Sequence, residues 1–250
     1  MRAAFRVLWC AVVLLPAVAL AQEEQDERVE QPLQSFHFSD PAYLQDPQAL
    51  QVAAGLRWSG EEQGNDNFTV PVQLQYGANE RFEFGAEVTL AFPRPLTGTL
   101  RSVERAEATV MMRFIDDRAH GVALSAGVGF LGSRDVLDNT FDPGGVPHVR
   151  AFAQRGVLLA NVDLSVDLVA RRDLDAVPRG ALGAALDFGM LQPVLEAVYE
   201  NDEAPTGIFA LGLRFHPFES LELGAAVPLQ VSEGQTNVGV TGQVVWSVGG

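Results

Sequence analysis

The chain has 250 residues, and its formal net charge is −15 because 32 Asp and Glu outnumber 17 basic residues, all of them Arg. This length allows one large domain or two small ones, and the composition excludes collagen, a disulfide-stapled miniprotein and a fully disordered chain. The acidic balance argues against a nucleic-acid partner, since a phosphate footprint needs a basic surface. The single cysteine, Cys10, excludes an internal disulfide.

Residues 1–21 have the layout of a secretory signal peptide. Arg2 and Arg6 supply a positive start, Val7–Leu20 is apolar, and the stretch ends in the small-x-small pattern Ala19-Leu20-Ala21. A membrane anchor is the alternative, but the apolar run is shorter than the about 20 residues that a spanning helix needs. We therefore expect export, with cleavage after Ala21.

Residues 22–48 form an acidic stretch that contains Pro32, Pro41 and Pro47. Such a composition does not bury enough apolar area to offset the entropy lost on ordering. We expect a disordered periplasmic leader here. A plug or a periplasmic handle is the less favoured alternative.

From residue 49 onward, apolar residues alternate with polar or small ones. In Phe82–Phe92 every second residue is apolar, while Glu83 and Glu87 lie on the opposite face, and Leu158–Leu168 repeats the arrangement. A period of two indicates β-strands. Each segment has about ten residues, which at about 3.3 Å per residue and a tilt near 45° span about 23 Å, close to the apolar band of an outer-membrane barrel.

Twelve strands are expected, at 49–59, 67–76, 81–92, 103–115, 120–131, 148–154, 157–169, 180–188, 190–200, 207–215, 219–230 and 236–248. Tight linkers alternate with longer polar ones such as Gly60–Asp66, Gly132–Pro147 and Ala170–Arg179. An even strand count with short turns on one side and long loops on the other is typical of bacterial outer-membrane barrels. The sequence predicts an all-β fold, a closed antiparallel transmembrane β-barrel over residues 49–250. Ten strands are the alternative, because the segment 148–154 is short.

Aromatic residues gather at both ends of the expected apolar band. Those at the long-loop ends are Trp58, Phe68, Phe92, Phe130, Tyr199 and Phe209, and those at the short-turn ends are Tyr76, Phe82, Phe114, Phe188, Phe215 and Trp246. Two membrane interfaces select for such girdles. A soluble β core would instead centre its aromatic residues.

A hairpin motif occurs twice. Tyr76–Val88 and Phe215–Val227 share the scheme aromatic, three residues, Glu, any residue, apolar, Glu, apolar, Gly, Ala. In these hairpins the chain resembles the Gram-negative outer-membrane barrel proteins regarded as transporters, including the phenol-degradation meta-pathway type. The resemblance spans residues 49–248 and implies an outer-membrane barrel rather than a particular substrate.

Two features depart from the pattern of that group. Its members usually end in an aromatic residue that the assembly machinery reads, whereas Trp246 is followed here by Ser247–Gly250. Pro71, Pro193 and Pro228 lie inside expected strands, and a closed barrel has no edge that tolerates the missing N–H donor. We expect bulges to absorb these prolines.

If the apolar face meets lipid, the opposite face lines a lumen. Its charged candidates are Arg57, Glu83, Glu87, Arg105, Glu107, Arg113, Asp163, Asp167, Asp187, Glu196, Glu200, Arg214 and Glu222. Acids on the seventh to ninth strands would oppose arginines on the first and fourth, and this transverse field favours dipolar or cationic solutes. Alternatively, the charges pair and fill the lumen. Inward glycines such as Gly212 and Gly224 leave space, which favours a narrow pore.

Passive transport of small solutes is therefore the expected function, with the charged inner face as the selectivity element. The alternatives are a non-conducting structural or adhesive protein and, less favoured, a lipid hydrolase. No enzyme activity is expected, because Ser125 and Ser165 point inward with no histidine in phase nearby. No cofactor or metal is expected either, since the four histidines are scattered. The expected partners are outer-membrane lipids, the barrel-assembly machinery and small solutes, and the expected location is the outer membrane with the N-terminus in the periplasm.

Overall fold

The computed structural model describes residues 37, 38, 40, 42, 44–60, 67–93, 102–134, 141–170, 174–201, 205–218, 220–232 and 234–249. The predicted signal peptide and residues 22–36 of the predicted leader lie outside this part of the chain. Within it, no helix is long and apolar enough to cross a membrane.

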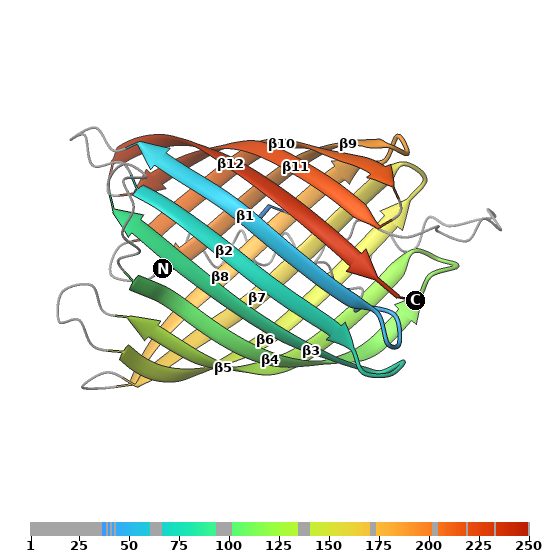
Figure 1. Ribbon diagram of the computed structural model, residues 1–250, viewed down its shortest axis with the longest axis horizontal. Helices are drawn as coiled ribbons and strands as arrows, with labels where there is room; N and C mark the ends of the chain where they lie inside the picture. The colour runs from blue at the N-terminus through green and yellow to red at the C-terminus, as the bar shows by residue number, and fades with distance from the viewer. Residues whose placement is uncertain are drawn as a thin grey trace, which may run out of the picture.

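The described residues form twelve strands, namely β1 (Leu50–Gly60), β2 (Asn67–Gly77), β3 (Phe82–Pro93), β4 (Ser102–Asp117), β5 (Val122–Arg134), β6 (Phe141–Arg155), β7 (Leu158–Ala170), β8 (Leu174–Leu186), β9 (Leu191–Asn201), β10 (Pro205–Phe218), β11 (Leu221–Ser232) and β12 (Gln235–Val248). Each strand pairs antiparallel with its neighbours in sequence, and β1 pairs with β12, so that the sheet closes on itself (Figure 1). The closed, all-β, twelve-stranded barrel predicted from the sequence is confirmed.

The period of two gives the barrel an apolar outer face and a mainly polar interior. On β5 the side chains of Val128 and Phe130 are 65% and 66% exposed on the outside, whereas Ser125 is buried inside. The predicted girdle residues Phe114 and Trp246, near the short turns, are also exposed on the outer face. Closure pairs both edges of the sheet, as a wall that faces lipid requires.

Several strands are longer than the sequence predicted, and the largest changes at a strand start are in β6 and β8. β6 begins at Phe141 instead of residue 148, and β8 begins at Leu174 instead of residue 180. Parts of the expected loops Gly132–Pro147 and Ala170–Arg179 therefore belong to the barrel wall. The glycines and prolines of these stretches concealed the strands, because these residue types usually mark turns and loops.

The prolines are accommodated by gaps in pairing instead of by the expected bulges. Around Pro71 the ladder between β1 and β2 lacks residue pairs without a change of register, and the ladder between β11 and β12 does the same around Pro228. Pro193 pairs with Leu213 of β10 and lies just beyond the last residue pair of β8 and β9. The missing N–H donors thus fall where pairing is locally interrupted.

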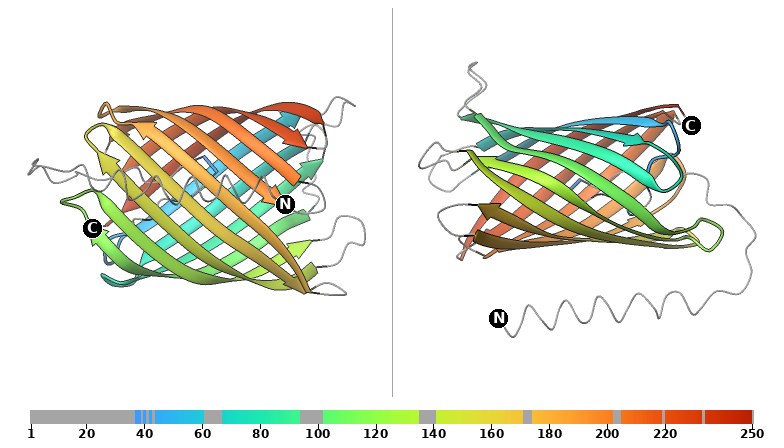
Figure 2. Two further views of the ribbon diagram at one scale, coloured as in Figure 1. Left: turned by 180° about the vertical axis from the view of Figure 1, so that it is seen from behind. Right: turned by 90° about the horizontal axis from the view of Figure 1, so that it is seen from below.

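The described residues between 37 and 49, which precede β1, lie inside the barrel (Figure 2), and we call them the luminal segment. It enters beside the turn between β2 and β3, where the Gln48 amide donates to the Gly77 carbonyl at 2.7 Å and the Gly77 amide donates to the Ala49 carbonyl at 3.0 Å. Ala42 is fully buried in an apolar cluster with inward residues of β5 to β9, namely Ala123, Phe152, Leu159, Ala185 and Val194. This part of the predicted leader is therefore packed against the wall, which its acidic, proline-containing composition did not indicate.

Candidate functional site

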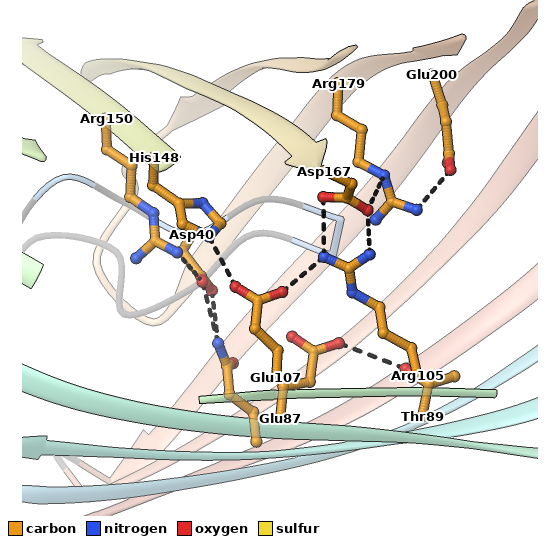
Figure 3. Close-up of polar contacts among 11 residues, drawn as sticks. Asp40, Glu87, Thr89, Arg105, Glu107, His148, Arg150, Asp167, Arg179 and Glu200 are labelled. Carbon is orange, nitrogen blue, oxygen red and sulfur yellow. Dashed lines mark hydrogen bonds and ion pairs between the residues drawn. The ribbon is translucent and has the colours of Figure 1, made fainter. Parts of the chain in front are cut away.

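Asp40 is the central anchor of the luminal segment. Its Oδ2 accepts hydrogen bonds from Arg150 Nη2 on β6 at 2.7 Å and from Gln73 Nε2 on β2 at 3.0 Å. Its backbone carbonyl accepts a hydrogen bond from Asn161 Nδ2 on β7 at 2.9 Å. One residue thus connects β2 with the neighbouring strands β6 and β7, and Figure 3 shows Asp40 facing Arg150.

Wall side chains also satisfy the backbone of the luminal segment. The carboxylate of Glu196 on β9 accepts hydrogen bonds from the amides of His37 at 2.8 Å and Phe38 at 3.1 Å. Glu83 on β3 accepts one from the Gln45 amide at 2.7 Å. The luminal segment is not a strand of the sheet, so its backbone has no neighbouring strand to bond to. Amides and carbonyls that are buried without a hydrogen-bond partner cost free energy. These carboxylates supply the missing partners.

Arg113 completes this contact from β4. Its Nη2 donates to the carbonyls of Leu44 at 2.9 Å and Gln45 at 3.3 Å, and its Nη1 pairs with Asp116 at 2.6 Å. Five of the predicted lumen-lining charges therefore bind the chain's own segment, namely Arg57, Glu83, Arg113, Asp163 and Glu196. The luminal segment therefore lies in the half of the lumen nearest the short turns.

Nearer the long loops, charged side chains connect strands that are not neighbours in the sheet. Arg105 on β4 reaches Asp167 on β7, although β5 and β6 lie between these strands, with a second contact from Arg105 Nη2 to Asp167 Oδ1 at 3.2 Å. The same Nη2 lies 2.6 Å from Glu107 Oε2, whose other oxygen lies 2.7 Å from His148 Nε2. Asp167 also pairs with Arg179 at 3.4 Å. Figure 3 shows this set, extended by Glu200 at 2.5 Å from Arg179, and we call it the cross-lumen network.

A cavity of about 600 Å³ remains between the luminal segment and the long-loop side. Its charged lining includes Arg57, Glu87 and Glu104 besides the cross-lumen network, and its apolar lining includes Val177 and Ile208. Among the described residues, no basic side chain lies within 4.0 Å of the Glu87 or the Glu104 carboxylate. The nearby Arg57 instead donates a hydrogen bond to the His37 carbonyl at 3.1 Å. The cavity therefore carries a negative excess.

The structure places all the predicted lumen-lining charges inside the barrel except Asp187. That residue lies in the turn between β8 and β9, where its carboxylate accepts from the Gly189 amide at 2.9 Å. Arg214 and Glu222 face inward but form a fully buried pair with each other, and Arg214 also donates to Gln243 at 2.9 Å. The charged face is therefore largely paired, the alternative that the sequence left open.

Sequence reasoning missed several residues of the site. Gln73 and His148 were in phase with the inner face, but neither belonged to the charged set. Arg179 was assigned to a loop that proved to be β8. Asp40 belonged to the predicted leader, and nothing in the local pattern signals its contacts because they come from distant strands.

Gly212 on β10 and Gly224 on β11 form a notch in the wall, the glycine notch, and the His37 ring occupies it. A Cβ atom at Gly212 would lie 2.5 Å from His37 Nε2, and one at Gly224 would lie 2.9 Å from His37 Cε1. The space expected to contribute to a pore is thus taken by an imidazole ring of the luminal segment.

The geometry bears on two kinds of chemistry, metal binding and catalysis by a serine with a histidine. Among the described residues, no three His, Cys, Asp or Glu side chains are grouped so as to hold a metal ion. Contrary to the expectation of no histidine in phase, His148 pairs directly with Ser165 across β6 and β7, and both line the cavity. However, Nδ1 of His148 has no hydrogen-bond partner among the described residues, so that Ser165 is not bonded to it.

Comparison with known proteins gives structural matches only. No protein-family model matches the sequence, and no curated protein matches it. An outer membrane channel from Pseudomonas putida F1 is similar in structure, with a TM-score of 0.63 and 10% identity over 91% of this chain and 100% of the other. The NanC porin has a TM-score of 0.53 and 13% identity over 79% and 98% of the two chains. Outer membrane phospholipase A from Escherichia coli has a TM-score of 0.53 and 14% identity over 92% and 96%. The chain therefore has the fold of outer-membrane β-barrels, a fold that channels, porins and a phospholipase share.

Proposed function

We propose that this barrel lets small solutes cross the outer membrane passively, through a narrow lumen with a charged wall. The cavity of about 600 Å³ beside the luminal segment carries this proposal. About 8 strands give a filled interior and 16 to 18 give an aqueous channel, so that twelve strands suit a narrow route. The structural likeness to an outer membrane channel and a porin supports the same reading.

The proposed orientation places the N-terminus in the periplasm. Short turns face the periplasm in barrels of this class. Residues 48 and 49 lie beside the short turn that follows Gly77. Export by the predicted signal peptide and insertion by the barrel-assembly machinery belong to this proposal, which follows from the class of fold.

Two constrictions lie in series along the proposed route. The luminal segment narrows the half nearest the short turns, and the bridge from Arg105 to Asp167 crosses the other half. Ionic groups that span a lumen restrict its cross-section and set the local field. We therefore expect a low conductance that rises when either constriction is removed.

The charge balance of the cavity supports a weak preference for cations. Arg105, Arg150 and Arg179 are each paired with at least one carboxylate, whereas Glu87 and Glu104 have no ion-pair partner among the described residues. A lumen with excess carboxylate attracts cations and repels anions.

Single-channel recording in planar bilayers tests the proposal. We expect small, weakly cation-selective currents, and the double change Glu87→Gln with Glu104→Gln should reduce that selectivity. Asp117→Asn is the matched control, because Asp117 at the end of β4 is exposed and pairs with His120 of the following turn. Swelling of liposomes in sugars and amino acids would then rank uncharged solutes. A correctly folded barrel that is ion-tight in every membrane would instead support a structural or adhesive role.

We also propose that the barrel is not an enzyme. The constellation of Ser165, His148 and Glu107 is the feature to test, because such residue types can form a nucleophile, a base and an orienting acid. Incubation of the purified protein with phospholipid and ester substrates should release no fatty acid. Release that Ser165→Ala abolishes would overturn this part of the proposal.

A further inference from the structure

The imidazole of His37 is the most tightly enclosed polar group of the luminal segment. The residue is 3% exposed, and its ring occupies the notch formed by Gly212 on β10 and Gly224 on β11. Neither ring nitrogen has a hydrogen-bond partner among the described residues. The ring is held by shape, since even one methyl group on Gly212 would collide with it.

This enclosure suits only a neutral ring. A charged imidazolium carries two N–H donors, and none of the described residues accepts a hydrogen bond from either ring nitrogen. Burial, followed by the positive charges of Arg214 and Arg57, lowers the pKa of His37 from its ordinary 6.5 to about 3. Arg57 is held beside the ring by its bond to the His37 carbonyl and by Phe38, whose ring centre lies 4.9 Å from its guanidinium carbon.

We propose that His37 is an acid-sensitive catch: its neutral ring seats the luminal segment in the glycine notch, and its protonation releases the segment from the lumen. Release is a property of the segment alone, whereas its effect on conduction rests on the proposed function. The two are therefore measured separately.

Charged groups reach His37 and its immediate surroundings from every strand that packs there. They are Arg57 from β1, Glu196 from β9, Arg214 from β10 and Glu222 from β11, while β12 contributes the neutral Gln243 and the luminal segment contributes Asp40. Glu196 also accepts hydrogen bonds from the luminal segment, and Asp40 binds the segment to the wall. A variant that lacks only the imidazole isolates the contribution of His37.

The direction and size of the effect follow from linkage. The pKa of His37 is lower when the segment is docked than when it is free, so the neutral ring favours docking. This contribution is complete above pH 6.5 and is lost as the pH falls from 6.5 toward 3. Each pH unit in that window weakens docking about tenfold, so that docking at pH 4.5 is about 100-fold weaker than at pH 7.5.

Hydrogen exchange of the full-length, detergent-solubilised protein measures docking directly. The reporters are the amides of His37, Phe38 and Gln45, which donate to wall carboxylates in the docked state. Wild type and His37→Gln are compared at pH 7.5 and at pH 4.5, which cancels the intrinsic exchange rates at each pH. We expect the wild-type segment to lose about 100-fold more protection than the variant on acidification. Equal losses in the two proteins would overturn the proposal.

A second substitution covers the case in which His37→Gln fails to give a heat-modifiable, folded barrel. Gly212→Ala fills the notch and should leave the segment poorly protected at both pH values. Gly207→Ala is its control, because the added methyl group would meet only a ring atom of Phe209 at 3.9 Å. Full wild-type protection in Gly212→Ala would contradict the catch. Acid-induced release without any change in conductance would refute the proposed function and leave the catch standing.

Discussion

Removal of the Asp40 carboxylate should release the luminal segment at neutral pH. Asp40→Ala takes away the acceptor that binds Arg150 and Gln73, and Arg150 is then left with Asp163 at 3.5 Å. A hydrogen bond to a charged group contributes about 1.5–3 kcal/mol, and the removal of one member of a buried ion pair costs about 3–5 kcal/mol. We take about 3 kcal/mol for this partly exposed carboxylate, which weakens docking about 150-fold.

Exchange protection of the Phe38 and Gln45 amides, together with single-channel conductance, measures this effect. Asp40→Ala should lower protection and raise conductance, and the loss of a negative charge beside Arg150 should shift selectivity toward anions. Asp40→Asn keeps an oxygen acceptor and should have a smaller effect. Asp46→Asn is the control, because Asp46 pairs with Arg118 where both side chains are over a third exposed, and such pairs contribute less than about 1 kcal/mol. Wild-type protection and conductance in Asp40→Ala would refute the idea that this carboxylate holds the segment.

Three further substitutions test the wall and the cross-lumen network. Arg105→Ala removes the bridge between β4 and β7, so that conductance and cation preference should both increase in bilayer recordings; unchanged values would show that the bridge does not limit passage. Arg214→Ala removes the arginine that pairs with the fully buried Glu222 carboxylate, and should lower the free energy of unfolding by about 3–5 kcal/mol in urea unfolding from vesicles. The control Arg118→Ala should lower it by less than about 1 kcal/mol, and similar losses in the two variants would contradict this ranking. Val128→Arg, on the outer face in the middle of β5, should cost about 2–4 kcal/mol, and Ile115→Arg near the short turn about 0–1 kcal/mol; a cost independent of depth would exclude a lipid-facing wall.

The architecture was predictable because it follows from local alternation. Glu83 and Glu196 belong inside and Val128 belongs outside, since successive side chains of a strand point to opposite faces. The strand count follows from the same pattern repeated along the chain. The starts of β6 and β8 were not predictable in this way, because their glycines and prolines carry a turn signal that only pairing with neighbouring strands overrides.

The partners inside the lumen were decided by the tertiary structure. Arg105 and Asp167 are 62 residues apart, and only the curvature of the closed sheet brings β4 to face β7. The acidic, proline-containing composition of residues 22–48 gave no sign that Asp40 or His37 would be ordered. The wall supplies the hydrogen bonds and the notch that hold the luminal segment. The sequence of the segment did not predict its order, because a local pattern reflects only the interactions within that segment.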